Sequence, residues 1–141
     1  MVIEFFSHEI DFHLTEQELV RDWLLLLVEA EGRELAQVTY IFCSDEYLLT
    51  LNREHLAHDY YTDILTFPYH VNAQAPIWSD MYISIDRVQE NAGTFGVAFR
   101  DELHRVVAHG LLHLLGYDDH GEESERLMRS KEEEALRKRS F

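Results

Sequence analysis

The stretch that decides this fold is His109-Gly-Leu-Leu-His113-Leu-Leu-Gly116-Tyr-Asp-Asp-His120. Residues four apart lie on one face of an α-helix, about 6 Å apart along its axis, so His109 and His113 are placed to converge on one cation. Gly116 stands where such a helix ends, because a residue without a Cβ atom adopts the left-handed cap conformation at little cost. The pattern predicts a metal-binding helix followed by a turn that delivers a third ligand.

That third ligand has two candidates. Zinc hydrolases with the pattern H-E-x-x-H-x-x-G-x-x-H place the last ligand three residues after the turn glycine, and here that residue is Asp119. His120 follows directly and is the more usual zinc donor, and a turn one residue longer would present it instead. The spacing favours Asp119. Either choice gives one zinc ion three protein ligands and leaves a position for water, as in catalytic zinc sites.

The general base is not evident near the two histidines. Gly110 occupies the position at which the protease pattern carries its catalytic glutamate, so the expected catalytic group is a metal-bound water whose base is unknown. Asp63 and Asp80, at strand ends, are candidates for the base or for groups that orient ligands and waters. Each of the two is equally consistent with a turn-capping role.

Composition limits the class of protein. At 141 residues and 46% hydrophobic residues, the chain suits one domain with a real core, and we expect a single domain over residues 1–141. No segment resembles a signal peptide and no apolar run spans a bilayer, while the single cysteine, Cys43, fits a reducing compartment. We therefore expect a soluble, cytoplasmic protein with no membrane association.

The charge of the chain is unusual for a nucleic-acid partner. A formal net charge of −15 argues against phosphate binding, which depends on lysine and arginine. The last sixteen residues soften this argument, because they contain six basic and three acidic residues. A solvated helix with charge pairs one turn apart also accounts for this tail.

Hydrophobic periodicity predicts alternating strands and helices. The expected strands are residues 2–6, 35–43, 64–67 and 81–85, and the expected helices are residues 15–31, 44–54, 86–93, 99–115 and a last helix from 122. Capping patterns start three of these helices: Thr15 with Glu18, Ser44, and Asp86 with Gln89.

The element order predicts an α+β fold, an α/β sandwich in which a small mixed four-stranded sheet packs with about five helices. Residues 99–115 are apolar nearly all round, which indicates a central, buried metal helix like that of zincins. The segment 55–61 has neither a helical nor a strand period, and as a loop between regular elements it is a candidate to border the active site.

Three segments of the chain resemble the YbeY family of bacterial metal-dependent endoribonucleases. Residues 109–118 resemble the family signature H-G-x-L-H-L-x-G-Y-D-H, and residues 51–67 resemble its N-x-x-x-R…T-D-V-L-S-F-P segment. Residues 80–85 resemble its G-D-I-x-I strand. With a matching element order, the resemblance covers most of the chain from Ser44 onward.

This resemblance implies one zinc ion bound by three histidines and cleavage of single-stranded RNA. It also implies maturation of the small-subunit ribosomal RNA 3′ end and ribosome quality control, with the small subunit and ribosomal proteins as partners. His109 and His113 match two ligands, whereas the family spacing of the third falls on Asp119 and its residue type on His120. Leu56 stands where the family has arginine, so a phosphate contact is missing.

Two other classes share parts of this pattern. A metallopeptidase or amidohydrolase has the same helix and turn but needs a base where Gly110 stands. A non-catalytic ribosome-assembly factor would use the metal for stability alone. Nitrogen and oxygen ligands also accept nickel or copper, so the predicted ligand set favours zinc but does not exclude these two metals.

Overall fold

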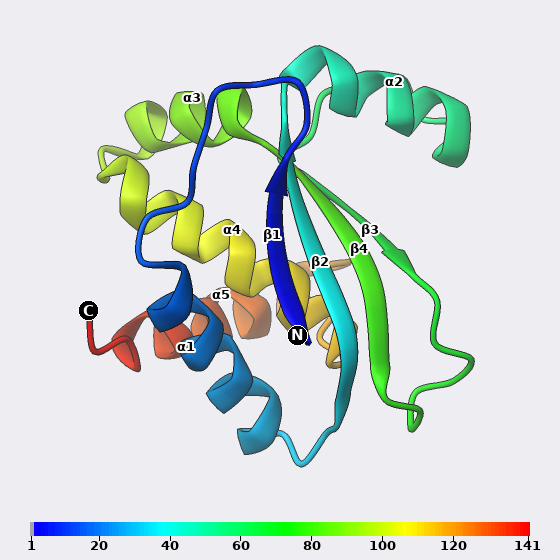
Figure 1. Ribbon diagram of the computed structural model, residues 1–141, viewed down its shortest axis with the longest axis vertical. Helices are drawn as coiled ribbons and strands as arrows, with labels where there is room; N and C mark the ends of the chain where they lie inside the picture. Colours follow the sequence, from blue (N-terminus) through cyan, green and yellow to red (C-terminus); the bar gives the residue numbers. More distant parts are fainter. Residues whose placement is uncertain (1) are drawn as a thin grey trace.

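The computed structural model, which describes residues 2–141, is built on a mixed four-stranded sheet (Figure 1). Its strands are β1 (Ile3–Ser7), β2 (Leu35–Cys43), β3 (Ile64–Pro68) and β4 (Ile77–Ser84), in the order β1-β2-β4-β3. Strand β2 runs parallel to β1 and β4, and β3 pairs antiparallel with β4. Strand β3 is therefore an edge strand, and the residues that flank it lie at the border of the sheet.

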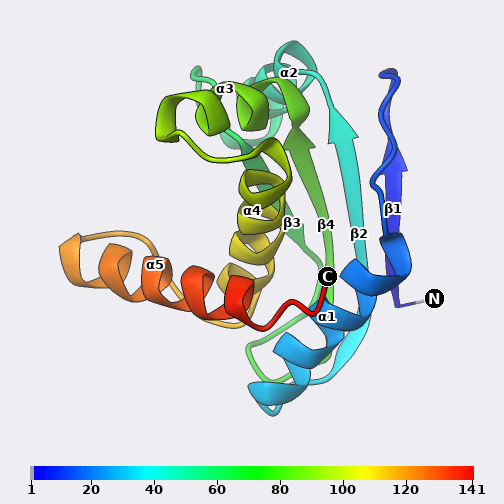
Figure 2. The same cartoon turned by 90° about the vertical axis from the view of Figure 1, so that its left-hand side faces the viewer.

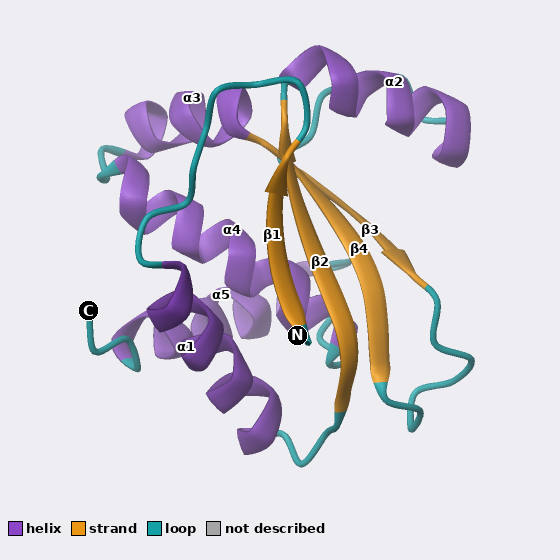
Figure 3. Ribbon diagram, viewed as in Figure 1, coloured by secondary structure: helices purple, strands orange, loops and turns teal. Residues whose placement is uncertain are grey.

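Five helices accompany the sheet, as predicted (Figure 3). They are α1 (Gln17–Ala30), α2 (Asp45–Leu56), α3 (Ile85–Phe95), α4 (Phe99–Leu114) and α5 (Glu122–Arg137). Figure 2 shows α4 against one face of the sheet, with α5 on the far side of α4. The predicted α+β fold is confirmed. Within residues 2–141, no helix combines the length and apolar composition needed to cross a membrane.

Helix α4 is the buried centre of the fold. Val106, Val107, Ala108 and Leu111 are fully buried in the main hydrophobic core. The hydroxyl of Tyr40, itself buried in β2, donates a hydrogen bond of 2.9 Å to the backbone carbonyl of Val107. This contact satisfies a polar group that would be costly to bury alone, and it joins the helix to the middle of the sheet.

Helix α2 packs on the opposite face of the sheet. Cys43 belongs to a smaller cluster with Leu48 and Leu51 of α2 and Leu65 of β3, whereas its neighbour Phe42 belongs to the main core. Adjacent residues of a strand point to opposite faces, so the two clusters lie on the two sides of the sheet. Burial and nearby carboxylates raise the pKa of the Cys43 thiol to about 12, which disfavours the nucleophilic thiolate at neutral pH.

One predicted helix start is confirmed and two are wrong. Ser44 caps α2 by accepting the N–H of Tyr47. Helix α1 instead begins after Glu16, whose backbone is left-handed, and no side chain caps this helix, so the capping box predicted for Thr15 and Glu18 does not form.

The cap of α3 also differs from the prediction. Ser84, not Asp86, accepts the N–H of Arg87 at the start of this helix. The Asp86 carboxylate accepts the backbone N–H of Asp45 at 2.9 Å, so it ties α3 to the first residue of α2. A contact between elements distant in sequence has replaced the local cap that the pattern indicated.

Candidate active site

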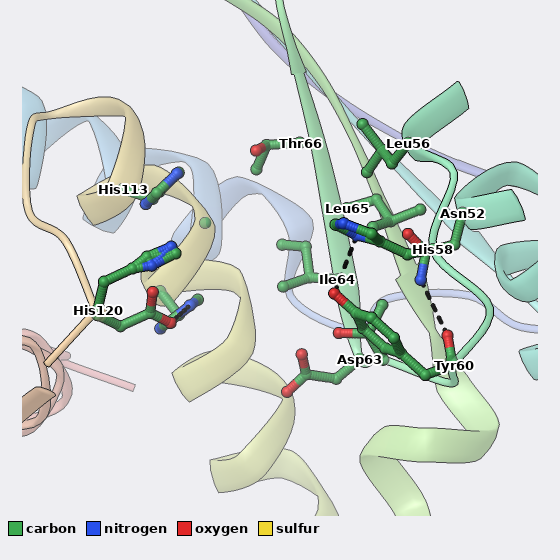
Figure 4. Close-up of a pocket in the computed structure, with 14 residues that line it drawn as sticks. Asn52, Leu56, His58, Tyr60, Asp63, Ile64, Leu65, Thr66, His113 and His120 are labelled. Carbon is green, nitrogen blue, oxygen red and sulfur yellow. Dashed lines mark hydrogen bonds and ion pairs between the residues drawn. The ribbon is translucent and has the colours of Figure 1, made fainter. Parts of the chain in front are cut away.

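A cleft of about 420 Å³ lies where α4 faces strand β3 and the loop that follows α2 (Figure 4). Figure 4 shows His113 and His120 on one side of this cleft and Leu56, His58 and Tyr60 on the other. The segment predicted to border the site therefore supplies one wall. The lining residues are Asn52, Leu56, His58, Tyr60, Thr62, Asp63, Ile64, Leu65, Thr66, His109, Gly110, His113, Asp119 and His120.

His109 is held from both sides by carboxylates. Its Nδ1 lies 2.6 Å from Oε2 of Glu132 on α5, and its Nε2 lies 3.6 Å from Oδ2 of Asp119. Glu132 is buried, while Asp119 lies at the cleft. A hydrogen bond from Nδ1–H to a carboxylate fixes the tautomer in which Nε2 carries a free lone pair, as in carboxylate–histidine–zinc sites. The ring is thus oriented to bind a cation from the cleft.

The electrostatics of this pair agree with its geometry. Burial by itself lowers the pKa of His109, but the hydrogen bond to Glu132 and the charges of Glu132, Asp63 and Asp119 together raise it. Burial raises the pKa of Glu132, and this effect is outweighed by His109 and Arg105, which lower it. A cation is favoured at this position, whether it is a proton or a metal ion.

The turn after α4 brings the candidate third ligands to the cleft. Gly116 has φ of 107°, in the region that favours glycine, and the chain reverses there as predicted. Asp119 and His120 both line the cleft. Ligand atoms of Asp118, Asp119 and His120 also lie within 4.8 Å of one another, but Asp118 Oδ1 accepts the N–H of His120 and Asp118 does not line the cleft.

Asp63, one of the two candidate bases, lies in the cleft. Burial raises the pKa of its carboxyl group, against the lowering effect of Arg105 and His109. The guanidinium of Arg105 lies 3.7 Å from Asp63 and also bonds to Glu102 and Glu132. Arg105 thus links the carboxylate in the cleft to the one that holds His109.

Asp80, the other candidate base, does not line this cleft. Its neighbour in β4, Met81, packs against Gly110 of α4, and alternation along the strand turns Asp80 to the opposite face of the sheet. There its carboxylate accepts a hydrogen bond of 2.7 Å from the hydroxyl of Tyr69. The structure therefore places Asp63 in the cleft with the histidines, and Asp80 on the face of the sheet that is turned away from α4.

Gly110 marks a close approach between α4 and the sheet. A Cβ atom at this position would lie 2.6 Å from both the Cδ1 atom of Ile64 and the Sδ atom of Met81. The position faces packed side chains, so a glutamate there would have to displace them before it reached the cleft. A glutamate at position 110 is therefore not compatible with the present packing of Ile64 and Met81.

Sequence reasoning missed Glu132 and Arg105. A solvated, charge-paired tail would leave Glu132 exposed, yet the residue is only 5% exposed. The available signal was periodicity: Glu132 follows Met128 by four residues and precedes Ala135 by three, which places it on the apolar stripe of α5. A carboxylate on a buried stripe needs a partner, and here its partners are His109 and Arg105.

Comparisons with known proteins place these features in a family context. The family described as Endoribonuclease YbeY matches residues 3–140. A protein of that name from Cytophaga hutchinsonii is 45% identical over 139 residues, covering 99% of this chain and 96% of the relative. Another from Flavobacterium psychrophilum is 44% identical over 132 residues, covering 94% and 93%. The solution structure of TM1509 from Thermotoga maritima has a TM-score of 0.61 and 28% identity, covering 95% of this chain and 86% of that one.

Proposed function

The chain belongs to the YbeY family of endoribonucleases, and on that premise we propose that it is a zinc-dependent endoribonuclease specific for single-stranded RNA. It is a hydrolase of the nuclease class. We assign it to the maturation of ribosomal RNA, at the 3′ end of the small-subunit RNA, and to ribosome quality control in the cytoplasm. The observation that carries the proposal is the orientation of His109 by Glu132 toward Asp119.

The donor types in the cleft suit one zinc ion per chain, and His109 and Asp119 are already close, whereas His113 has to move nearer to them to complete the set. His109 offers Nε2 because Glu132 occupies its Nδ1, and His113 follows one turn later on the same wall. Asp119 completes a set of two nitrogen donors and one oxygen donor, which is typical of catalytic zinc. We favour Asp119 over His120 because its carboxylate lies 3.6 Å from His109. Bound zinc supplies Lewis acidity toward a phosphate oxygen and acidifies a water molecule.

Within this scheme Asp63 acts as the general base. Its carboxylate lines the cleft with the metal-binding residues, and burial raises its pKa toward neutrality, which improves its ability to accept a proton. Arg105 holds Asp63 and Glu132 in one ionic cluster, so a common side chain fixes the base and the orientation of His109. Phosphodiester hydrolysis needs these groups to be positioned relative to one another before the substrate arrives.

The peptidase alternative is disfavoured by packing. A base directly after the first histidine would have to occupy the space that Ile64 and Met81 fill beside Gly110. Asp63 instead lines the cleft from the side of β3, across from the histidines of α4. We therefore retain RNA as the substrate.

The test combines zinc content with cleavage of a labelled single-stranded RNA. We expect wild type to hold one zinc ion and to cleave, and His113→Ala and Asp119→Ala to lose both properties while His120→Ala keeps them. Circular dichroism checks folding, a duplex RNA checks strand preference, and casein checks for peptidase activity. Stoichiometric zinc without RNA cleavage by wild type would contradict the nuclease proposal. Loss of zinc in His120→Ala but not in Asp119→Ala would identify His120, instead of Asp119, as the third ligand.

A further inference from the structure

The wall of the cleft opposite the metal-binding residues carries exposed rings (Figure 4). The rings of His58 and Tyr60 are stacked, with centroids 5.2 Å apart and planes inclined by 22°. The Tyr60 hydroxyl lies 3.0 Å from His58 Nδ1, which fixes the two rings relative to each other. Tyr60 is 55% exposed and the adjacent Leu56 is 40% exposed, although all three side chains line the cleft. The chain therefore leaves a rigid, apolar and aromatic surface uncovered beside its catalytic groups.

Asn52 holds this wall in place from beneath. Its backbone carbonyl accepts the N–H of His58, and its side-chain amide donates a hydrogen bond of 2.9 Å to the carbonyl of Tyr60. Asn52 itself is fully buried. These bonds hold the backbone that carries both rings, and the bond between the rings limits their motion, which reduces the entropic cost of binding.

Phosphate contacts offer little binding energy at this wall. No lysine or arginine is among the described residues that line the cleft. Arg53, near the end of α2, is paired with Asp59, and Arg105 is engaged by Glu102 and Glu132. With a net charge of −15, the chain does not offer a basic groove here. A single-stranded RNA can instead be held through its base faces, since stacking on aromatic side chains is independent of backbone charge.

We propose that Leu56, His58 and Tyr60 form a nucleobase subsite, in which an unpaired base of the RNA stacks on the His58–Tyr60 pair while its phosphate lies at the metal-binding residues. The inference rests on the proposed nuclease function, and it explains why the enzyme would prefer single-stranded to double-stranded RNA. A base in a duplex is already stacked and paired, so its face is not available to this surface. A single strand presents the face freely.

The protein side of the test compares Tyr60 with its neighbour. Tyr61 is also exposed, but it does not line the cleft, and its hydroxyl donates to Glu46. We expect Tyr60→Leu to raise the KM for single-stranded RNA about tenfold, with unchanged zinc content, and Tyr60→Phe to stay close to wild type because the ring remains. Tyr61→Leu should leave KM unchanged. Equal KM values for Tyr60→Leu and wild type would overturn the subsite.

The RNA side of the test removes one base at a time. Zinc-loaded protein is titrated with a single-stranded 2′-O-methyl oligonucleotide, shown by gel to stay intact during the titration, in which an abasic residue replaces each nucleotide in turn. We expect one abasic position to weaken binding by wild type about tenfold, and to have no further effect on Tyr60→Leu, because the ring that stacks on that base is then gone. If the abasic position weakens binding by the same factor in wild type and in Tyr60→Leu, Tyr60 does not stack on that base and its role is structural.

The binding assay also separates this inference from the proposed function. If wild type binds the oligonucleotide through Tyr60 but does not cleave RNA, the nuclease proposal fails and the subsite stands. If wild type cleaves RNA with no dependence on Tyr60, the subsite fails and the nuclease proposal stands.

Discussion

Two histidines on different faces of α4, His104 and His109, have opposite environments, although they are only five positions apart in the sequence. His104 is buried against Trp23 and Phe141, and its Nδ1 accepts a hydrogen bond of 2.7 Å from Arg139. His109 faces the cleft, and its Nδ1 bonds to the carboxylate of Glu132. Burial, with Arg139 and Arg100, lowers the pKa of His104 to about 4, whereas the carboxylates around His109 raise its pKa.

The difference shows that the partner of Nδ1 decides what a histidine on this helix does. An arginine donor leaves His104 neutral and uses its ring as a packing element between aromatic side chains. A carboxylate acceptor makes His109 more basic and directs its free nitrogen into the cleft. Helical spacing places the two side chains about 140° apart around the helix axis and so predicts different faces, but it does not identify the partner of either ring nitrogen.

The largest expected effect is the difference in zinc binding and RNA cleavage between a variant of His109 and a variant of His104. We expect His109→Ala to abolish stoichiometric zinc binding and to reduce RNA cleavage roughly a thousandfold, because a three-ligand site then keeps only two ligands. His104→Phe should keep both properties. Metal analysis and single-turnover cleavage measure these effects. A loss of zinc in a folded His104→Phe protein would contradict the conclusion that only the His109 face of α4 serves the metal site.

A smaller effect is expected when the partner of His109 is changed and the ligand itself is kept. Glu132→Gln should weaken zinc affinity by about 10- to 100-fold, because the neutral amide no longer holds the imidazole in its basic, oriented form. Competition with a chromophoric chelator measures this affinity. Glu133→Gln, at the exposed neighbouring position, is the matched control. Equal affinities in Glu132→Gln and wild type would mean that Glu132 acts only through Arg105 and the fold.

The smallest expected effect is a change of stability with pH at His104. The unfolded chain takes up a proton on this residue near its ordinary pKa of 6.5, whereas the folded chain does so only near 4. Stability from this group is therefore complete above pH 6.5 and is lost as the pH falls through this window, by roughly 2 kcal/mol at about pH 4.5.

Urea unfolding of metal-free wild type and His104→Phe, followed by circular dichroism at several pH values, measures this loss. We expect the variant to gain stability relative to wild type as the pH falls from about 7 to 4.5. A constant difference between the two proteins over that range would show that His104 titrates normally in the folded state.

Several local features were predictable because they depend on neighbours in the chain. The extent of α4, the turn at Gly116 and the Ser44 cap of α2 agree with the predictions, since periodicity, glycine and a serine cap act within a few residues. The Thr15 cap was wrong because α1 starts one residue later, after Glu16 in a left-handed conformation, and the Asp86 cap was wrong because Asp86 bonds to Asp45 of α2 while Ser84 caps α3.

The sequence by itself determined the element order, the helix that carries His109 and His113, and the position of the turn, because helical spacing and glycine geometry are properties of short segments. Only the tertiary structure decided which carboxylates reach His109. Strand alternation turned Asp80 away from the cleft, β3 placed Asp63 in it, and the packing of α5 on α4 buried Glu132 beside the imidazole. These contacts join residues more than twenty positions apart, and no local pattern encodes such distances.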